Sequence, residues 1–477
     1  MAVMSQSAAR GAAHEHFPDF LRQRAHAHFI DTWHDGKAED SIYMPSDKSN
    51  EVAREYKDLL ASARTPWLSL IVGGMAQTIT LTGIRSPDGR MLESWAQWQR
   101  NRLDLRQPQV TRAVLKHGLA YGRVGSGIDP LTGTAGAKFT FRSMADAAAW
   151  YDPDDDEWPY LYLQAEPYRT TKGDTGWMVE MVDEVATYFL SCVGDGSDLK
   201  SWKFLDYRIH GFRVPPIISF GNVIDIDGRH TGEVEPLIPI AKRIDQTTFD
   251  RLIVQRYGAW KVRYVTGMAR PKSRAEAQEL SLRLSVEDLL IAESKDTKFG
   301  TLDASDLKGF LEARGSDLRD LSSLAQFPTH QIIGLGDQMQ PESLAAAEAA
   351  QSRRRAAVKV NLGESWEQML RLSAVVVGNR AEAEAYDSEA RWAEYESRSL
   401  VQIAQAMGIF ASQVGVPQEM LFETMPGWTD SDVQRAMRLV REGTVDDVLA
   451  AMEAQIAEGG TGLDISGGQP VRVPAAV

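Results

Sequence analysis

The chain has 477 residues, 43% of them hydrophobic, which is enough for roughly two to four domains with sizeable cores. Its formal net charge of −14 argues against a conventional DNA-binding domain, because basic side chains that neutralise phosphates supply most of the affinity for nucleic acid. The single cysteine, Cys192, excludes a disulfide within the chain and a multi-cysteine metal site, and it favours a reducing compartment. We expect no signal peptide and no transmembrane helix, since no run of about 18 apolar residues occurs.

The first 40 residues show no clear apolar periodicity, and we expect them to be weakly ordered or peripheral. They contain a group of histidines, which are common metal ligands: His14, His16, His26, His28 and His34. A zinc site needs a fixed scaffold and partners that orient its ligands, so a terminal segment without metal is the favoured interpretation. From residue 50 to residue 79 the apolar spacing predicts two helices, the second starting near Pro66.

The next segment combines helices and strands. The pattern predicts a strand at 80–83, helices at 91–101 and 107–119, and a strand at 120–128. Three glycines on this last strand, Gly122, Gly125 and Gly127, superficially resemble a phosphate-binding loop. No Lys-Ser/Thr pair follows them and no helix opens directly after them, so a tight strand turn is the better interpretation.

Residues 130–230 alternate between apolar and polar side chains in short runs, which predicts a small antiparallel sheet with hairpins. The strands are expected at residues 138–141, 160–164, 177–182 and 187–192. The acidic run DPDDDE at 152–157 lacks the spacing of a calcium loop, so a solvated turn is favoured. Cys192 has no basic residue close by in sequence, which favours a buried structural thiol.

Two long amphipathic helices flank an insertion in the second half of the chain. The first begins near residue 233, with Pro236 and Pro239 at its start, where proline costs least. The second is predicted at 306–326, and the insertion at about 259–303 combines strands with a short helix at 273–284. Neither helix can bury its apolar stripe without packing on a neighbour.

A loop at 334–340 precedes a very long helix, which Pro341 opens and which extends to Val377. Gly363, near its middle, is expected to weaken or kink this helix. Residues 382–398 are predicted to be irregular or strand-like, and the tail from 459 to be disordered. Further helices are expected at residues 400–414, 418–422, 429–441 and 444–456.

The order of these elements resembles the bacteriophage portal protein family of tailed double-stranded DNA phages, in particular the branch common in phages of actinobacteria. The stretches that carry the resemblance are WQRNRLDLRQPQVTRAVLKHGLAYGRVGSG (98–127), GEVEPLIPIAKRIDQTTFDRLIVQRYGAWKVRYVTG (232–267), FPTHQIIGLGDQMQPESLAAAEAA (327–350) and AMGIFASQVGVPQEMLFETMPGWTDSDVQRAMRL (406–439). None of them is a catalytic motif, and the specificity of the resemblance comes from their order along the chain.

The resemblance implies an α+β, mainly helical fold with wing, stem, clip and crown regions, assembled as a ring. The regions would be an N-terminal arm (1–40), the wing (41–232), stem helix 1 (233–258), the clip (259–303), stem helix 2 (304–328), the tunnel loop (329–340), a long wing helix with the following segment (341–398), crown helices (399–456) and a disordered tail (457–477).

The resemblance also implies a non-enzymatic function. A dodecameric ring at the unique capsid vertex would conduct double-stranded DNA during packaging and ejection. Its partners would be the terminase large subunit, a head-tail connector or adaptor, and the major capsid and scaffolding proteins, with no membrane and no cofactor. The protein would be in the virion and, during assembly, in the host cytoplasm.

The candidate site residues follow from the same resemblance. The loop residues expected to approach DNA are Gly336, Asp337, Gln338, Met339 and Gln340. Three successive arginines, Arg353, Arg354 and Arg355, are candidates for channel or inter-subunit contacts, although neighbouring helix positions point in different directions.

Two alternatives remain open at this point. One is a virion adaptor that binds protein partners without a central channel. The other is a metal-dependent nuclease or hydrolase using the acidic residues at 152–157, for which the sequence shows a charge run but no catalytic or metal-ligand motif.

Overall fold

The computed structural model describes residues 2–39, 42, 50–128, 133–154, 156–169, 173–226, 228–258, 263–266, 298–301, 307–334, 341–393, 400–423, 425, 428 and 430–441. The chain divides into two compact units, residues 1–393 and 394–477. The expected helices at 273–284 and 444–456, the loop residues 335–340 and the tail lie outside the described residues.

A five-stranded antiparallel sheet with the order β4-β5-β6-β7-β8 forms one layer of the first unit. Its strands are β4 (Ala147–Trp150), β5 (Leu161–Arg169), β6 (Thr175–Val182), β7 (Ala186–Val193) and β8 (Lys203–Ile209). Three of these strands match the alternation in the sequence, whereas β4 and β8 were not predicted. Both are edge strands: β4 is short, and β8 is exposed along nearly its whole length, so neither shows a clear apolar alternation.

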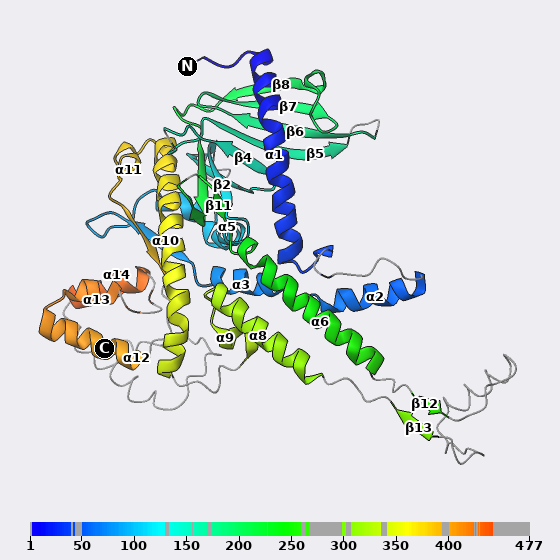
Figure 1. The fold of residues 1–477 in the computed structure, drawn as a ribbon. Helices are drawn as coiled ribbons and strands as arrows, with labels where there is room; N and C mark the ends of the chain where they lie inside the picture. The colour runs from blue at the N-terminus through cyan, green and yellow to red at the C-terminus, as the bar shows by residue number, and fades with distance from the viewer. Residues whose placement is uncertain are drawn as a thin grey trace. The chain divides into compact units, whose positions relative to one another are not determined.

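Helix α1 (Gln6–His34) lies across this sheet (Figure 1). The expectation of a weakly ordered N-terminus is therefore wrong. Ala9, Ala13, Phe17 and Phe20 are fully buried and share one core with the sheet. These residues recur at helical spacing, but half of them are alanines separated by histidines and other polar residues, so the stripe is inconspicuous in the sequence.

A three-stranded antiparallel sheet with the order β3-β2-β9 forms the centre of the unit. Its strands are β2 (Leu119–Ile128), β3 (Ala135–Ser143) and β9 (Ile217–Gly221). Helices α5 (Leu103–His117) and α10 (Pro341–Val377) pack against it. Trp366 of α10 contacts Phe220 of β9 and Trp98 at ring-centroid distances of 4.6 and 4.9 Å. Aromatic burial of this size fixes α10 on the sheet.

Helix α10 runs without a break from Pro341 through Gly363 to Val377, so the glycine does not end it. A Cβ atom at this position would lie 3.4 Å from Cβ of Ala390, on strand β14. Helix and strand therefore lie in close contact at this position. Strand β14 (Glu389–Trp392) pairs antiparallel with β1 (Leu81–Arg85), far away in sequence.

Helices α6 (Ile238–Gly258) and α8 (Lys308–Leu324) lie side by side (Figure 1). They correspond to the two long helices predicted from the sequence. The described part of the insertion between them is an antiparallel pair of strands, β12 (Arg263–Thr266) and β13 (Lys298–Thr301). Helix α2 (Asn50–Ala63) packs on α6.

The other elements of this unit are the helices α3 (Trp67–Ala76), α4 (Trp95–Arg100), α9 (Thr329–Ile333) and α11 (Arg380–Ala383), the short strands β10 (Val223–Ile224) and β11 (His230–Thr231), and the 3₁₀ turns at Leu199–Ser201 and Glu235–Leu237. Helix α9 occupies the first part of the segment expected to be the tunnel loop. Pro328 precedes this helix, and Gly334, in the left-handed conformation (φ 79°), ends it. No helix among the described residues is long and apolar enough to cross a membrane.

The second unit is helical in its described part. Helix α12 (Leu400–Ile409) continues into one turn of π-helix (Phe410–Val414), and α13 (Gln418–Glu423) and α14 (Asp430–Arg441) follow. These bounds confirm three of the four helices predicted after residue 399.

Candidate functional site

The paired helices α6 and α8 form one side of the candidate site. Leu318 and Leu321 on α8 and Ile240 and Ile244 on α6 are buried in the same core. These apolar residues recur at steps of three and four, so each helix turns one stripe toward the other. The pairing leaves one flank of both helices exposed.

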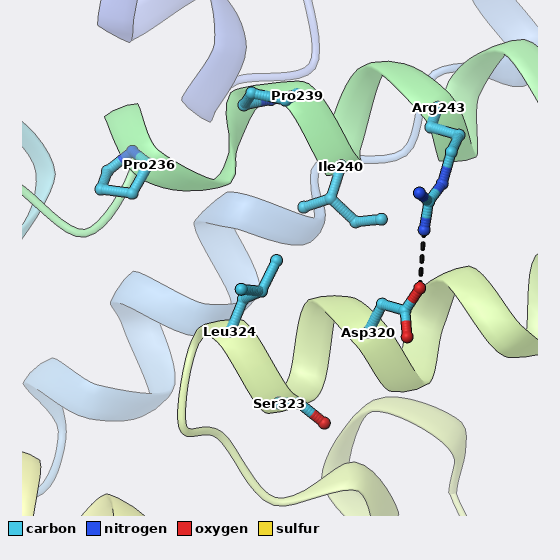
Figure 2. Close-up of a pocket in the computed structure, with 7 residues that line it drawn as sticks. All are labelled: Pro236, Pro239, Ile240, Arg243, Asp320, Ser323 and Leu324. Atoms are coloured by element: carbon cyan, nitrogen blue, oxygen red, sulfur yellow. Dashed lines mark hydrogen bonds and ion pairs between the residues drawn. The ribbon is translucent and has the colours of Figure 1, made fainter.

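Arg243 connects the two helices on this exposed flank (Figure 2). Its Nε lies 2.8 Å from Asp317 Oδ1, and its Nη2 lies 2.7 Å from Asp320 Oδ2. Arg243 and Asp320 are both exposed, so water screens their ion pair and it contributes little to stability, whereas Asp317 is buried. Their geometry nevertheless fixes which turn of α8 lies beside Arg243.

Next to this ion pair the exposed flank is hollowed, with an open volume of about 420 Å³ (Figure 2). The lining is mostly apolar and consists of Pro236, Pro239, Ile240, Arg243, Asp320, Ser323 and Leu324. Leu324 is 64% exposed. An apolar hollow with one charged pair at its end suits contact with another protein surface.

A second cluster connects α10 to the start of α6. Glu233 is buried, and its Oε1 accepts hydrogen bonds from Arg354 Nε (3.1 Å), Arg354 Nη2 (2.5 Å) and Asn222 Nδ2 (2.8 Å). Asn361 Nδ2 donates to the backbone oxygen of Asn222 at 2.6 Å. Two positions of α10, Arg354 and Asn361, are thereby tied to the chain just before α6.

The three arginines of α10 have three different environments. Arg353 is exposed, Arg354 binds Glu233, and Arg355 is buried with its Nη2 2.8 Å from Ser352 Oγ. The structure therefore does not bring them together on one face. The candidate residues Gly336, Asp337, Gln338, Met339 and Gln340 lie outside the described residues.

A third cluster, which the sequence did not indicate, fastens α1 to α5. Asp31 Oδ1 lies 2.6 Å from Lys116 Nζ and 2.7 Å from His117 Nε2. Burial raises the pKa of Asp31, but hydrogen bonds from His117 and Lys116 outweigh it and lower the pKa overall. Burial lowers the pKa of His117, and the hydrogen bond with Asp31 only partly offsets this.

The histidines of α1 have separate partners. His14 lies 2.9 Å from the backbone oxygen of Ser197, His26 lies 3.5 Å from Glu235, and His34 lies 2.9 Å from Asp35. His16 contacts the ring of Trp150, and His28 lies 3.6 Å from Asp31. Within the described part of the chain, no three His, Cys, Asp or Glu side chains gather in a group that could hold a metal ion.

The sequence interpretation of Cys192 is confirmed. Cys192 is a buried free thiol, and burial raises its pKa to about 11. Gly122, Gly125 and Gly127 lie within strand β2 and pair with β3, so the prediction of a tight turn at these glycines is wrong. In the acidic segment, Asp152 accepts a hydrogen bond from the backbone nitrogen of Asp154, as in a turn.

Comparison with known proteins identifies the class of protein that carries these features. Residues 48–458 match the family described as "Phage portal protein, SPP1 Gp6-like", a family of structural proteins of phage particles. The chain belongs to the phage portal protein family. The match begins after α1, so the helix that covers the five-stranded sheet lies outside the matched residues.

The other comparisons are less specific. No curated protein matches the sequence. Among solved structures, a chain from "Neck of empty GTA particle computed with C6 symmetry" is similar, with 13% sequence identity and a TM-score of 0.42, over 76% of this chain and 90% of that chain.

Proposed function

We propose that twelve copies of this chain form a ring at the unique capsid vertex, and that double-stranded DNA passes through its channel during packaging and ejection. Membership of the portal family supports a portal function. The α6–α8 pair supports a ring, because each copy buries one side of the pair in its own core and leaves a hollowed flank for a neighbour.

The regions are assigned as the resemblance implies. Helices α6 and α8 are the stem, residues 259–303 are the clip, and residues 399–456 are the crown. The segment from Gly336 to Gln340 lines the narrowest part of the channel, and α10 returns from it to the wing. The tie between Arg354 and Glu233 would then join the loop-bearing helix to the entrance of the stem.

Passage of DNA requires weak and reversible contacts. A net charge of −14 disfavours tight phosphate binding, which would hold DNA at one register. Gln338, Met339 and Gln340 offer adaptable contacts without a fixed positive charge. We further propose that the clip docks the terminase large subunit first and a head-tail connector later, and that capsid and scaffolding proteins surround the ring.

The observation that carries the proposal is the exposed, hollowed flank of a helix pair within a portal-family chain. The test is the mass of the purified protein by light scattering, combined with images averaged along the symmetry axis. We expect a mass near twelve times 52.9 kDa and a central channel wide enough for duplex DNA. A monomer or dimer in several buffers would support an adaptor without a channel, and metal-dependent turnover of DNA would support a nuclease.

A further inference from the structure

Two arginines continue the facing sides of helices α6 and α8. Thr247 on α6 lies 3.5 Å from Asp317 on α8, measured from Oγ1 to Oδ2. The helices are antiparallel, since the hollow on their exposed flank joins the start of α6 to the end of α8. One turn further along the pair, the facing positions are Arg251 and Arg314. Arginine is rarely buried without a partner of opposite charge.

The two guanidinium groups repel each other. Both side chains are half-buried, which withdraws them from part of the water that would screen their charges. Burial lowers the pKa of Arg314, and the positive charge of Arg251 lowers it further. Among the described residues, the carboxylates of α8 that meet α6 pair with Arg243 instead. Two cations held this close are stable only when a negative charge lies beside them.

Three N–H groups in this region have no acceptor among the described residues. They are the Nε of Arg251, the Nε of Arg314 and the Nε1 of Trp67, and all three atoms are buried. Trp67 is the first residue of α3, and the Cζ of Arg314 lies 5.7 Å from the centre of its ring. Each buried donor without an acceptor costs free energy. A partner for these groups must be an acceptor, and the two positive charges favour an anion.

The charge of the region selects among anions. Two arginines bring two positive charges, and a carboxylate or a phosphodiester would neutralise only one of them. A phosphate group with free oxygens carries a charge of about −1.5 to −2 at pH 7. The planar fork of arginine also matches the spacing of phosphate oxygens. Phosphate therefore satisfies both the charges and the donors.

We propose that Arg251, Arg314 and Trp67 form a binding site for inorganic phosphate between α6, α8 and the start of α3. The bound ion neutralises the two arginines and joins the three helices. The site lies within one copy of the chain, so this inference does not depend on the proposed ring.

The first experiment measures the binding of phosphate to the full chain by calorimetry at pH 8, with sodium chloride keeping the ionic strength constant. We expect saturable binding of one phosphate per chain. Arg314→Met should weaken this binding at least about tenfold, because it removes charge-assisted hydrogen bonds. Arg319→Met removes an exposed charge from the same helix and should bind phosphate like the wild type. Absence of saturable binding, or equal binding by both variants, overturns the inference.

Thermal unfolding without phosphate tests whether the chain itself supplies the acceptor. Arg251→Met removes the repulsion with Arg314, so its Tm without phosphate should be no lower than that of the wild type. Added phosphate should raise the Tm of the wild type and raise that of the variant much less. A variant that is clearly less stable than the wild type without phosphate would show that a carboxylate of the chain already pairs with Arg251, and the site would be rejected.

A third experiment tests the charge of the ligand. Dimethyl phosphate carries one charge and resembles the DNA backbone, and it should bind at least about tenfold more weakly than inorganic phosphate. Equal binding would assign the site to a phosphodiester and overturn the choice of inorganic phosphate. Sulfate is doubly charged and should compete with phosphate, because a site built only of donors cannot distinguish the two ions. Sulfate that does not compete would contradict such a site.

Discussion

Half-buried Arg354 and buried Glu233 form an ion pair in which one carboxylate oxygen accepts both guanidinium hydrogen bonds, at 2.5 and 3.1 Å. The two residues are 121 positions apart in the sequence and belong to different regions of the proposed portal subunit. Glu233 precedes α6, and Arg354 lies on α10. The pair therefore links α10 directly to the segment that precedes α6.

Arg354→Met tests how much this ion pair contributes to the stability of the fold. Removal of the guanidinium leaves Glu233 buried with Asn222 as its remaining side-chain donor, and we expect the free energy of unfolding to fall by about 2–4 kcal/mol. Arg353→Met, at the adjacent exposed position, should change it by less than about 0.5 kcal/mol. Denaturant titrations of both variants provide the comparison, and equal effects would contradict the assignment.

Stability should depend on pH through buried histidines. Burial lowers the pKa of His230, and it lowers the pKa values of His117 and His210 as well. Between the lowered pKa and the ordinary value near 6.5, the unfolded chain binds more protons than the folded chain. Stability is therefore complete above about pH 6.5 and decreases as the pH falls below it.

His230 provides the cleanest test of this dependence, because burial is the cause of its shift. We expect the free energy of unfolding, measured by denaturant titration, to decrease from pH 7.5 to pH 5, with a slope of at most about 1.4 kcal/mol per pH unit for each histidine. His230→Gln should make this decrease smaller. An unchanged slope in His230→Gln would refute the explanation.

Gly118 is predicted to be intolerant of any side chain. It has φ of 92°, and an added Cβ would lie 2.8 Å from the backbone nitrogen of Gly232. Gly118→Ala combines the cost of the left-handed conformation, about 1–2 kcal/mol, with this backbone clash, so we expect a loss of at least about 3 kcal/mol. At Gly89 (φ 82°) an added Cβ would meet no atom within 4 Å, so Gly89→Ala should show only the cost of the left-handed conformation. Comparison of the thermal unfolding of the two variants separates the cost of the left-handed conformation from the cost of the clash.

The proposed channel loop predicts a specific defect. Gln338→Lys combined with Gln340→Lys adds fixed positive charges, which would retain passing phosphates. We expect normal rings but impaired DNA packaging or retention, measured as the DNA content of assembled particles. Normal packaging and ejection by the double variant, or an experimental structure with the loop on the outer surface, would count against the proposed lining.

The free protein should bind DNA poorly. With a net charge of −14, we expect little binding of duplex DNA at physiological salt in an equilibrium titration. A submicromolar, sequence-specific Kd under these conditions would be incompatible with a conduit through which DNA slides.

The long helices could be predicted from the sequence because their signals are local. Helix α10 starts at Pro341 and ends before Gly378, which has φ of 78°, and both ends agree with the prediction. Helix α1 was missed because alanines and histidines obscure its apolar stripe. Its helical form becomes clear only with the sheet beside it.

The contacts of the candidate site could not be predicted, because they join distant residues. Asp31 meets His117 across 86 positions, and Arg243 meets Asp320 across 77. Each of these side chains looks like an ordinary surface charge in the sequence. Only the packing of α1 on α5 and of α6 beside α8 brings the partners together.

Strand β1 pairs with β14, and their register joins Leu81 to Trp392. During synthesis, β1 therefore has no partner strand until the ribosome has added more than three hundred further residues. Helix α10, which covers the central sheet, is also translated late. The first unit can complete its fold only when translation has passed residue 392, so a truncated chain has an open sheet edge and an uncovered core. Chains translated beyond residue 392 are consequently the first in which the first unit can present its finished surfaces to other copies.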